Sequence, residues 1–260
     1  MPALTISTVY LISGANRGIG FGLTEVLAKR PGTVVFAGAR DPTNATALNA
    51  LAEKYPHSVH VLKLTSGSTE DNKSAVVEIE KTVGQLDVVI ANAATGGYYG
   101  SLLTTPGEEF LNHFNINTLG PVTLFQAVHS LLIKSPSGAP HFCVISSAVG
   151  STELGLSFGA AAYSASKAAV NHLTKIIHTE HEADGIIATA IHPGWVATDM
   201  GNFGASSLGM TEAPVTLAES VAGILSHIDG ATRSEKSGKF WNFARTSGNF
   251  WDINESVLPW

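Results

Sequence analysis

The feature that most constrains the fold is a glycine turn near the start of the chain, at Ser13–Gly20. A short apolar run, Thr8–Ile12, leads into this turn, and Leu23, Val26 and Leu27 follow it at helical spacing. Strand, glycine turn and helix in this order are typical of a unit that binds a dinucleotide. A glycine loop without a ligand is the alternative, and the position between a strand and a helix favours the dinucleotide site.

Each glycine of the turn has a distinct expected role. Gly14 allows a sharp turn, Gly18 allows the backbone to approach a ligand, and Gly20 allows the helix to pack closely on the strand. Free N–H groups at the start of the helix favour a phosphate. The residues of this turn expected to bind the cofactor are Gly14, Asn16, Arg17, Gly18, Ile19 and Gly20.

Apolar strands alternate with helical segments along the rest of the chain. Further strands are predicted at Thr33–Gly38, Val59–Leu64, Leu86–Ala91, His141–Ser146, Ile186–Ile191 and Lys239–Phe243. Further helices are predicted at Thr43–Tyr55, Glu70–Val83, Pro106–Lys134, Ala160–Glu182 and Pro214–Ile228. The alternation predicts an α/β fold with right-handed crossovers, and the nearly uninterrupted apolar runs suit parallel strands buried on both faces. We find no repeat or linker, so residues 1–260 are expected to form a single domain.

Composition narrows the possible partners. Hydrophobic residues make up 44% of the chain, and the net charge is −6 without a Lys/Arg-rich run, which argues against nucleic acid or an anionic membrane as the partner. The lone cysteine permits no internal disulfide, and the ten histidines form no familiar metal-binding motif, so no metal is expected. Without a leader-like or membrane-length apolar run, a soluble cytoplasmic protein is expected.

The residues at the end of the second predicted strand indicate which nicotinamide cofactor binds. An NAD-binding unit usually places an acidic residue there, whereas this strand ends in Ala39 followed by Arg40. Arg40, together with Arg17, would supply forked cationic donors to a 2′-phosphate, so NADP(H) is favoured over NAD(H). Asp41 keeps NAD(H) open, and solvated loop charges are the other interpretation of the two arginines.

Tyr163 and Lys167 lie one helical turn apart on the same face of a predicted helix. Such a pair could move a proton, although this spacing also arises by chance. Ser147 follows the fifth strand, where the carboxyl end of a parallel strand opens into the usual ligand crevice. The helix before that strand is interrupted near Asn115 and Asn117, which are both expected to face the core.

These motifs occur together in the order found in the short-chain dehydrogenase/reductase family. They are Ser13-Gly14-x-x-x-Gly18-x-Gly20, Asn92-Ala93-Ala94, Asn117, Ser147, Tyr163-x-x-x-Lys167 and Pro193-Gly194. The resemblance covers almost the whole chain, and within the family the chain is most similar to fungal ketoreductases of the norsolorinic acid group. It implies a Rossmann fold with a doubly wound, seven-stranded parallel sheet and helices on both faces.

The resemblance also implies roles for four catalytic residues. Tyr163 would donate a proton to a carbonyl oxygen as hydride arrives from the nicotinamide, and Lys167 would lower the pKa of that phenol and hold the nicotinamide ribose. Ser147 would hydrogen-bond the carbonyl oxygen, and Asn117 would hold a water in a proton relay. The expected activity is NADPH-dependent reduction of a ketone, apolar or aromatic, in secondary metabolism.

By the same resemblance a second set of residues lines the cofactor site, with Val196 and Thr198 at the nicotinamide end. These residues are Thr65, Asn92, Ala93, Ala94, Pro193, Gly194, Val196 and Thr198. Thr65 replaces the aspartate that holds adenine in many members, and the insertion Ser151–Phe158 lengthens the interval before Tyr163. A substrate-binding loop or lid is expected at about residues 195–213, and a homodimer or homotetramer is expected because relatives often associate.

Two other functions are compatible with this fold. One is a redox-neutral enzyme of secondary metabolism, such as a cyclase or dehydratase. The other is a non-catalytic module that binds NADP without turnover, since a fold does not by itself determine a function. The intact Tyr163 and Lys167 argue against the second alternative.

Overall fold

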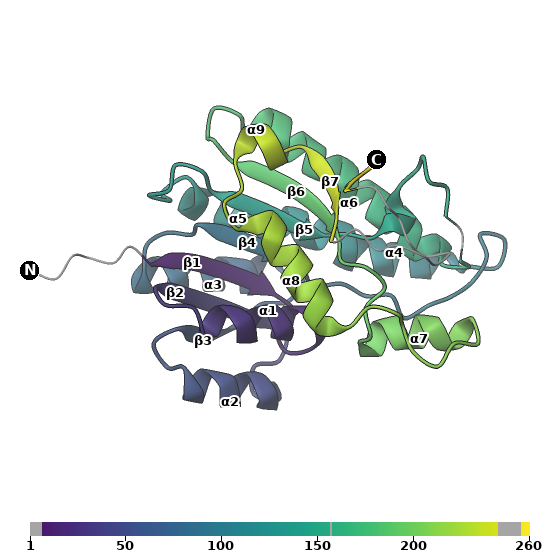
Figure 1. The fold of residues 1–260 in the computed structure, drawn as a ribbon, viewed down its shortest axis with the longest axis horizontal. Helices are drawn as coiled ribbons and strands as arrows, with labels where there is room; N and C mark the ends of the chain where they lie inside the picture. The colour runs from purple at the N-terminus through teal and green to yellow at the C-terminus, as the bar shows by residue number, and fades with distance from the viewer. Residues whose placement is uncertain (1–6, 157, 244–255) are drawn as a thin grey trace, which may run out of the picture.

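The chain folds into one sheet with helices on both of its faces (Figure 1). The computed structural model describes residues 7–156, 158–243 and 256–260. The strands in chain order are β1 (Thr8–Ser13), β2 (Thr33–Ala39), β3 (Val59–Lys63), β4 (Val88–Ala91), β5 (His141–Ile145), β6 (Ile187–His192), β7 (Lys239–Asn242) and β8 (Val257–Leu258). They lie in the order β3-β2-β1-β4-β5-β6-β7-β8. The strands β1 to β3 are thus added toward one edge of the sheet, and from β4 onward they are added on the other side of β1. A ligand crevice opens at such a switch point.

The predicted α/β sheet is confirmed, with one correction to the number of strands. Strands β1 to β7 are parallel, as expected, whereas β8 pairs antiparallel with β7 through Phe240 and Leu258. Within the described residues the sheet therefore has eight strands and not seven. A two-residue strand is too short to give a period in the sequence, so the aromatic tail offered no signal for it.

Two layers of helices bury the two faces of the sheet (Figure 1). Helices α1 (Gly18–Ala28), α2 (Thr46–Lys54) and α8 (Leu217–Ile228) pack on one face. Helices α3 (Thr69–Thr82), α5 (Gly120–Leu132) and α6 (Ala161–Glu180) pack on the other. The central strands are buried on both faces, which explains their continuous apolar runs.

The long helix predicted over Pro106–Lys134 is divided into three pieces. Helix α4 (Gly107–Phe114) passes into a π-helical turn, η1 (Asn115–Leu119), before α5 begins. Within this turn Asn117 is buried but Asn115 is exposed, so the expectation that both face the core is wrong for Asn115. The wider π turn changes which residues face inward, and such turns are frequent at functional sites.

A helix occupies the middle of the predicted substrate loop at residues 195–213. Helix α7 (Asp199–Ser207) begins at Thr198, whose Oγ1 accepts a hydrogen bond from the Gly201 N–H at 3.2 Å. Trp195 Nε1 donates to the Gly201 carbonyl at 3.0 Å. This N-cap and the indole bond offset the low helix propensity of the Gly/Ser-rich sequence. Short helical segments at η2 (Ala148–Gly150) and α9 (Arg233–Lys236) complete the fold. No helix in the described ranges is long and apolar enough to span a bilayer.

Candidate active site

A pocket of about 1290 Å³ opens at the carboxyl ends of the parallel strands. Ligand pockets typically measure about 300–1,000 Å³, so this one has room for a dinucleotide and a second molecule. The predicted residues that line it are Gly14, Asn16, Arg17, Gly18, Ile19, Arg40, Thr65, Asn92, Ala93, Ala94, Ser147, Tyr163, Lys167, Pro193, Gly194, Val196 and Thr198. Gly20 and Asn117 lie behind the wall of the pocket.

The glycine turn has the geometry that a phosphate requires. Gly14 and Gly18 have φ angles of 65° and 54°, in the left-handed region that favours glycine. A Cβ on Gly20 would lie 2.3 Å from the Gly14 carbonyl oxygen, so this position also requires glycine. No side chain caps the start of α1, which leaves its first N–H groups available to an anion. These features fit the diphosphate of a nicotinamide dinucleotide.

Ser13 and Asn92 fix the turn against the end of β4. Ser13 Oγ accepts hydrogen bonds from the N–H groups of Asn92 and Ala93, both at 3.0 Å. Asn92 Nδ2 donates to the carbonyl oxygens of Ser13 at 2.9 Å and Gly14 at 3.1 Å. The Asn92 side chain therefore holds the shape of the glycine turn, and Ser13 keeps the hydroxyl that this contact requires.

The two candidate 2′-phosphate ligands differ in their surroundings. Arg17 Nη1 lies 3.3 Å from Asp199 Oδ2, and both side chains are largely exposed. Arg40 is exposed and makes no ion pair with any residue in the described ranges. The Asp41 carboxylate accepts from the hydroxyl of Thr43 and the side-chain amide of Asn44, both at 2.6 Å. These hydrogen bonds, that of Thr43 first, lower the pKa of Asp41 and tie its carboxylate to its own turn.

Thr65 lies in the pocket wall, as the resemblance implied. The Thr65 side chain hydrogen-bonds Asp71 of α3, and this bond is the largest cause of a lowered pKa for Asp71. Lys63 Nζ also lies 3.3 Å from Asp71 Oδ1. The Asp71 carboxylate therefore lies beside Thr65, and α3 supplies it.

Tyr163, Ser147 and Lys167 meet in the pocket wall. Burial raises the pKa of Tyr163 to about 12, and a hydrogen bond with Ser147 opposes this shift. Lys167 was expected to lower this pKa, but its ammonium is not among the groups that shift it, and the net change is upward. Lys167 Nζ lies 5.7 Å from the Tyr163 ring centroid and donates instead to the Ile145 carbonyl at 2.8 Å. The phenol therefore holds its proton at neutral pH.

Burial also lowers the pKa of Lys167, from 10.5 to about 8, which makes stability depend on pH. As the pH rises from 8 to 10.5, the folded chain releases this proton before the unfolded chain does. The free energy of unfolding therefore increases across that window. Relative to Lys167→Met, we expect the parent to gain about 2 kcal/mol between pH 7 and pH 9.5, measured by urea unfolding at each pH. A difference between the two proteins that stays constant with pH would contradict the shifted pKa.

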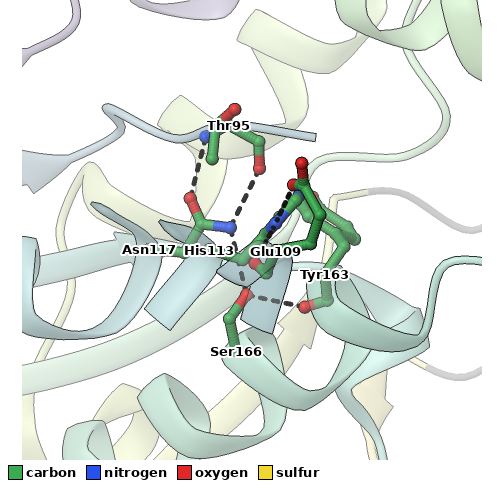
Figure 2. A network of polar contacts seen from close by, with 6 residues as sticks. All are labelled: Thr95, Glu109, His113, Asn117, Tyr163 and Ser166. Carbon is green, nitrogen blue, oxygen red and sulfur yellow. Dashed lines mark hydrogen bonds and ion pairs between the residues drawn. The ribbon is translucent and has the colours of Figure 1, made fainter. Parts of the chain in front are cut away.

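The Asn117 side chain connects the loop after β4 to the start of α6 (Figure 2). Its Oδ1 accepts from the Thr95 N–H at 2.8 Å, while Nδ2 donates to the Thr95 carbonyl at 2.9 Å and to Ser166 Oγ at 3.0 Å. Ser166 Oγ donates in turn to the Tyr163 carbonyl at 2.7 Å. Asn117 Nδ2 thus bonds both Thr95 and Ser166, and the second bond positions the segment that carries Tyr163. The expected water held by Asn117 stays a prediction.

His113 is a residue near Tyr163 that the sequence did not indicate (Figure 2). Its side chain is buried, with Nδ1 2.8 Å from the Glu109 carbonyl oxygen, and its ring meets the Tyr163 ring edge-on at a centroid distance of 6.4 Å. It therefore supports one side of the tyrosine ring. His113 precedes Asn117 by one helical turn, and that spacing is the signal that could have indicated it.

The insertion before Tyr163 lines part of the pocket through Leu156 and Phe158. The last described residue, Trp260, holds this insertion. Its carbonyl accepts from the N–H groups of Thr152 at 3.1 Å and Glu153 at 3.2 Å. Further apolar and aromatic residues that line the pocket include Tyr99, Val149, Trp195, Met200 and Leu208.

A parallel sheet with a glycine turn at its switch point, and a Tyr–Ser–Lys group across the same pocket, defines a nicotinamide-dependent oxidoreductase. The family model for short chain dehydrogenases matches residues 8–206. The chain belongs to the short-chain dehydrogenase/reductase family, which acts on small molecules.

Similar proteins support this family at the level of sequence and fold. A norsolorinic acid ketoreductase of Aspergillus parasiticus is 39% identical over 97% of this chain and 91% of its own length. One from Emericella nidulans is 37% identical over 96% of both chains. Among solved structures, the NADPH-bound carbonyl reductase from chicken fatty liver is 30% identical and has a TM-score of 0.85, covering 98% of this chain and 99% of its own.

Proposed function

We propose that this chain is an NADPH-dependent carbonyl reductase that converts an apolar or aromatic ketone to an alcohol. The observation that carries the proposal is the hydrogen bond between Tyr163 and Ser147, beside Lys167, in the pocket that contains the glycine turn. The nicotinamide, when bound, supplies the hydride. This chain must then provide a proton, a hydrogen-bond donor to the carbonyl oxygen and a pocket that holds the cofactor and the ketone together.

Tyr163 and Ser147 act on the carbonyl oxygen of the substrate. The Tyr163 hydroxyl donates its proton to the oxygen as negative charge develops there, and Ser147 adds a second hydrogen bond that stabilises this charge. Lys167, buried beside them with a pKa of about 8, is mostly protonated at neutral pH, and a nearby ammonium stabilises the phenolate that forms when Tyr163 gives up its proton. Asn117 holds the first turns of α6 in place through Ser166.

NADPH is favoured over NADH by the charges at the far end of the pocket. Arg40 is free of ion pairs within the described part of the chain, and Asp41, the nearest acid, is tied to Thr43 and Asn44. A 2′-phosphate would gain a charged donor there, whereas a ribose hydroxyl would find no available carboxylate at Asp41. The NADPH-bound carbonyl reductase with the same fold supports this choice.

The lining of the substrate side supports a ketone that is apolar or aromatic. Tyr99, Trp195, Met200 and Leu208 offer ring and aliphatic surface, and burial of a ligand against them would remove apolar area from water. Two similar fungal proteins are named norsolorinic acid ketoreductases, which agrees with this substrate class.

Consumption of NADPH against a panel of ketones tests the proposal. The panel compares polycyclic aromatic ketones, single-ring ketones and small aliphatic ketones, and each alcohol product is identified by mass spectrometry. We expect kcat/KM to be more than about tenfold higher for the aromatic ketones than for the small ones. Substrate conversion without NADPH consumption would indicate the redox-neutral alternative, and NADPH binding without any conversion would indicate the non-catalytic one.

Association between copies of the chain is part of the proposal. Large apolar side chains are exposed around α4 and the turn after it, at Leu103, Leu111, Phe114 and Leu119, with Leu103 94% exposed. Apolar surface of this kind often marks an interaction site. We expect a dimer or tetramer in light-scattering measurements.

A further inference from the structure

Two histidines and an aspartate converge at the end of the sheet opposite the pocket. His129 lies in the last turn of α5, His181 follows the end of α6, and Asp184 precedes β6. His129 Nε2 lies 3.0 Å and His181 Nδ1 lies 2.7 Å from the same oxygen, Asp184 Oδ2. The three candidate ligand atoms all lie within 4.8 Å of one another. None of these residues lines the pocket, which meets β6 at its other end, at His192.

Neighbouring aromatic contacts hold the two imidazole rings in place. The His129 and His181 ring centroids are 4.7 Å apart, and the Phe125 ring meets both edge-on, at 5.8 Å and 5.0 Å. The three side chains remain 30%, 25% and 35% exposed for His129, His181 and Asp184, so an ion from solvent can reach them. The ligand group is thus positioned by packing and still accessible.

The donor set matches the chemistry of zinc. Two imidazole nitrogens and one carboxylate oxygen are common zinc ligands, with bonds of about 2.0–2.2 Å and a tetrahedral arrangement completed by water. Tetrahedral geometry with such bonds separates the ligand atoms by about 3.4 Å, so each nitrogen needs to move away from the carboxylate by less than about 1 Å. Hydrogen bonds from His181 and then His129 lower the pKa of Asp184, which keeps its carboxylate ionised.

We infer that His129, His181 and Asp184 form a binding site for zinc or a chemically similar first-row divalent cation. On binding, each ring replaces its N–H···O bond with a nitrogen–metal bond, and its proton moves to the other ring nitrogen. The ion joins the end of α5 to the turn between α6 and β6. Its role is to stabilise the fold, away from the site of reduction.

Calorimetric titration of the chelator-treated full chain with zinc chloride tests this site. We expect one zinc ion per chain at micromolar concentrations, and an affinity that falls by more than about tenfold in His181→Gln and in Asp184→Asn. His172→Gln removes an exposed histidine of α6 outside the cluster, so it should bind zinc as the parent does. Magnesium, which prefers oxygen ligands, should not bind in the same range.

A thermal unfolding series gives a second measurement that does not depend on enzyme activity. Excess zinc should raise the melting temperature of the parent and of His172→Gln, but not that of Asp184→Asn, because only ligands that prefer the folded state stabilise it. Asn has nearly the same shape as Asp, so the Asp184→Asn variant should fold, and circular dichroism would check that it does. Equal zinc affinity in the parent and both cluster variants, or no binding by the parent, would overturn the inference.

Discussion

Replacement of Tyr163 by phenylalanine is expected to lower kcat for ketone reduction by about 10²- to 10⁴-fold, the usual contribution of a positioned general acid. The change removes only the hydroxyl, whose hydrogen bond with Ser147 places it in the pocket wall. The remaining ring keeps its packing against His113, so the variant should fold and bind NADPH. Steady-state NADPH consumption and cofactor titration would measure both properties.

Tyr99→Phe is the matched control for this experiment. Tyr99 also lines the pocket, and its pKa is also raised by burial, but a hydrogen bond with Ser147 is not among the influences on it. We expect Tyr99→Phe to change kcat by less than about tenfold, because it loses a phenol that donates no proton to the substrate. If Tyr163→Phe reduced ketones as fast as the parent, the proposed mechanism would be wrong.

Replacement of Arg40 by alanine is expected to weaken NADPH binding by about 1.5–3 kcal/mol, or about ten- to 150-fold. The reason is that a hydrogen bond between charged groups is lost, while NADH has no 2′-phosphate and should bind almost unchanged. Arg40 makes no ion pair with the described residues, so the substitution leaves no carboxylate among them without its ion-pair partner. Fluorescence titration with each cofactor would measure the two affinities.

Arg17→Ala provides a comparison for the Arg40 result. Arg17 lies 3.3 Å from Asp199, so part of its charge is already offset, and we expect a smaller loss of NADPH affinity than for Arg40→Ala. Losses of equal size for NADPH and NADH in Arg40→Ala would exclude a role in binding the 2′-phosphate.

Much of the fold could be predicted because its signals are local. Apolar runs mark strands buried on both faces, and the predicted ends of the seven parallel strands lie within two residues of the observed ends. Gly14 was expected to allow a sharp turn, and its φ is positive. These properties depend on the residue itself and its immediate neighbours.

Other features could not be predicted because they depend on packing between distant segments. Helix α7 forms from a Gly/Ser-rich sequence because Thr198 and Trp195 hydrogen-bond its first turn. Asn117 is buried while Asn115 is exposed because a π turn changes the helical register. In each case the local sequence permits several conformations, and contacts with neighbouring segments select one.

The sequence by itself determined the α/β class, the strands of the parallel sheet and the residues that line one pocket. The class and the strands follow from periodicity. The pocket residues follow from the rule that parallel strands direct their carboxyl ends to one edge, together with the resemblance to the short-chain dehydrogenase/reductase family. Only the tertiary structure decided the raised pKa of Tyr163, the Asn117–Ser166 connection and the meeting of His129 with Asp184. Burial, hydrogen-bond partners and ligand distances are properties of folded neighbours, which linear spacing does not specify.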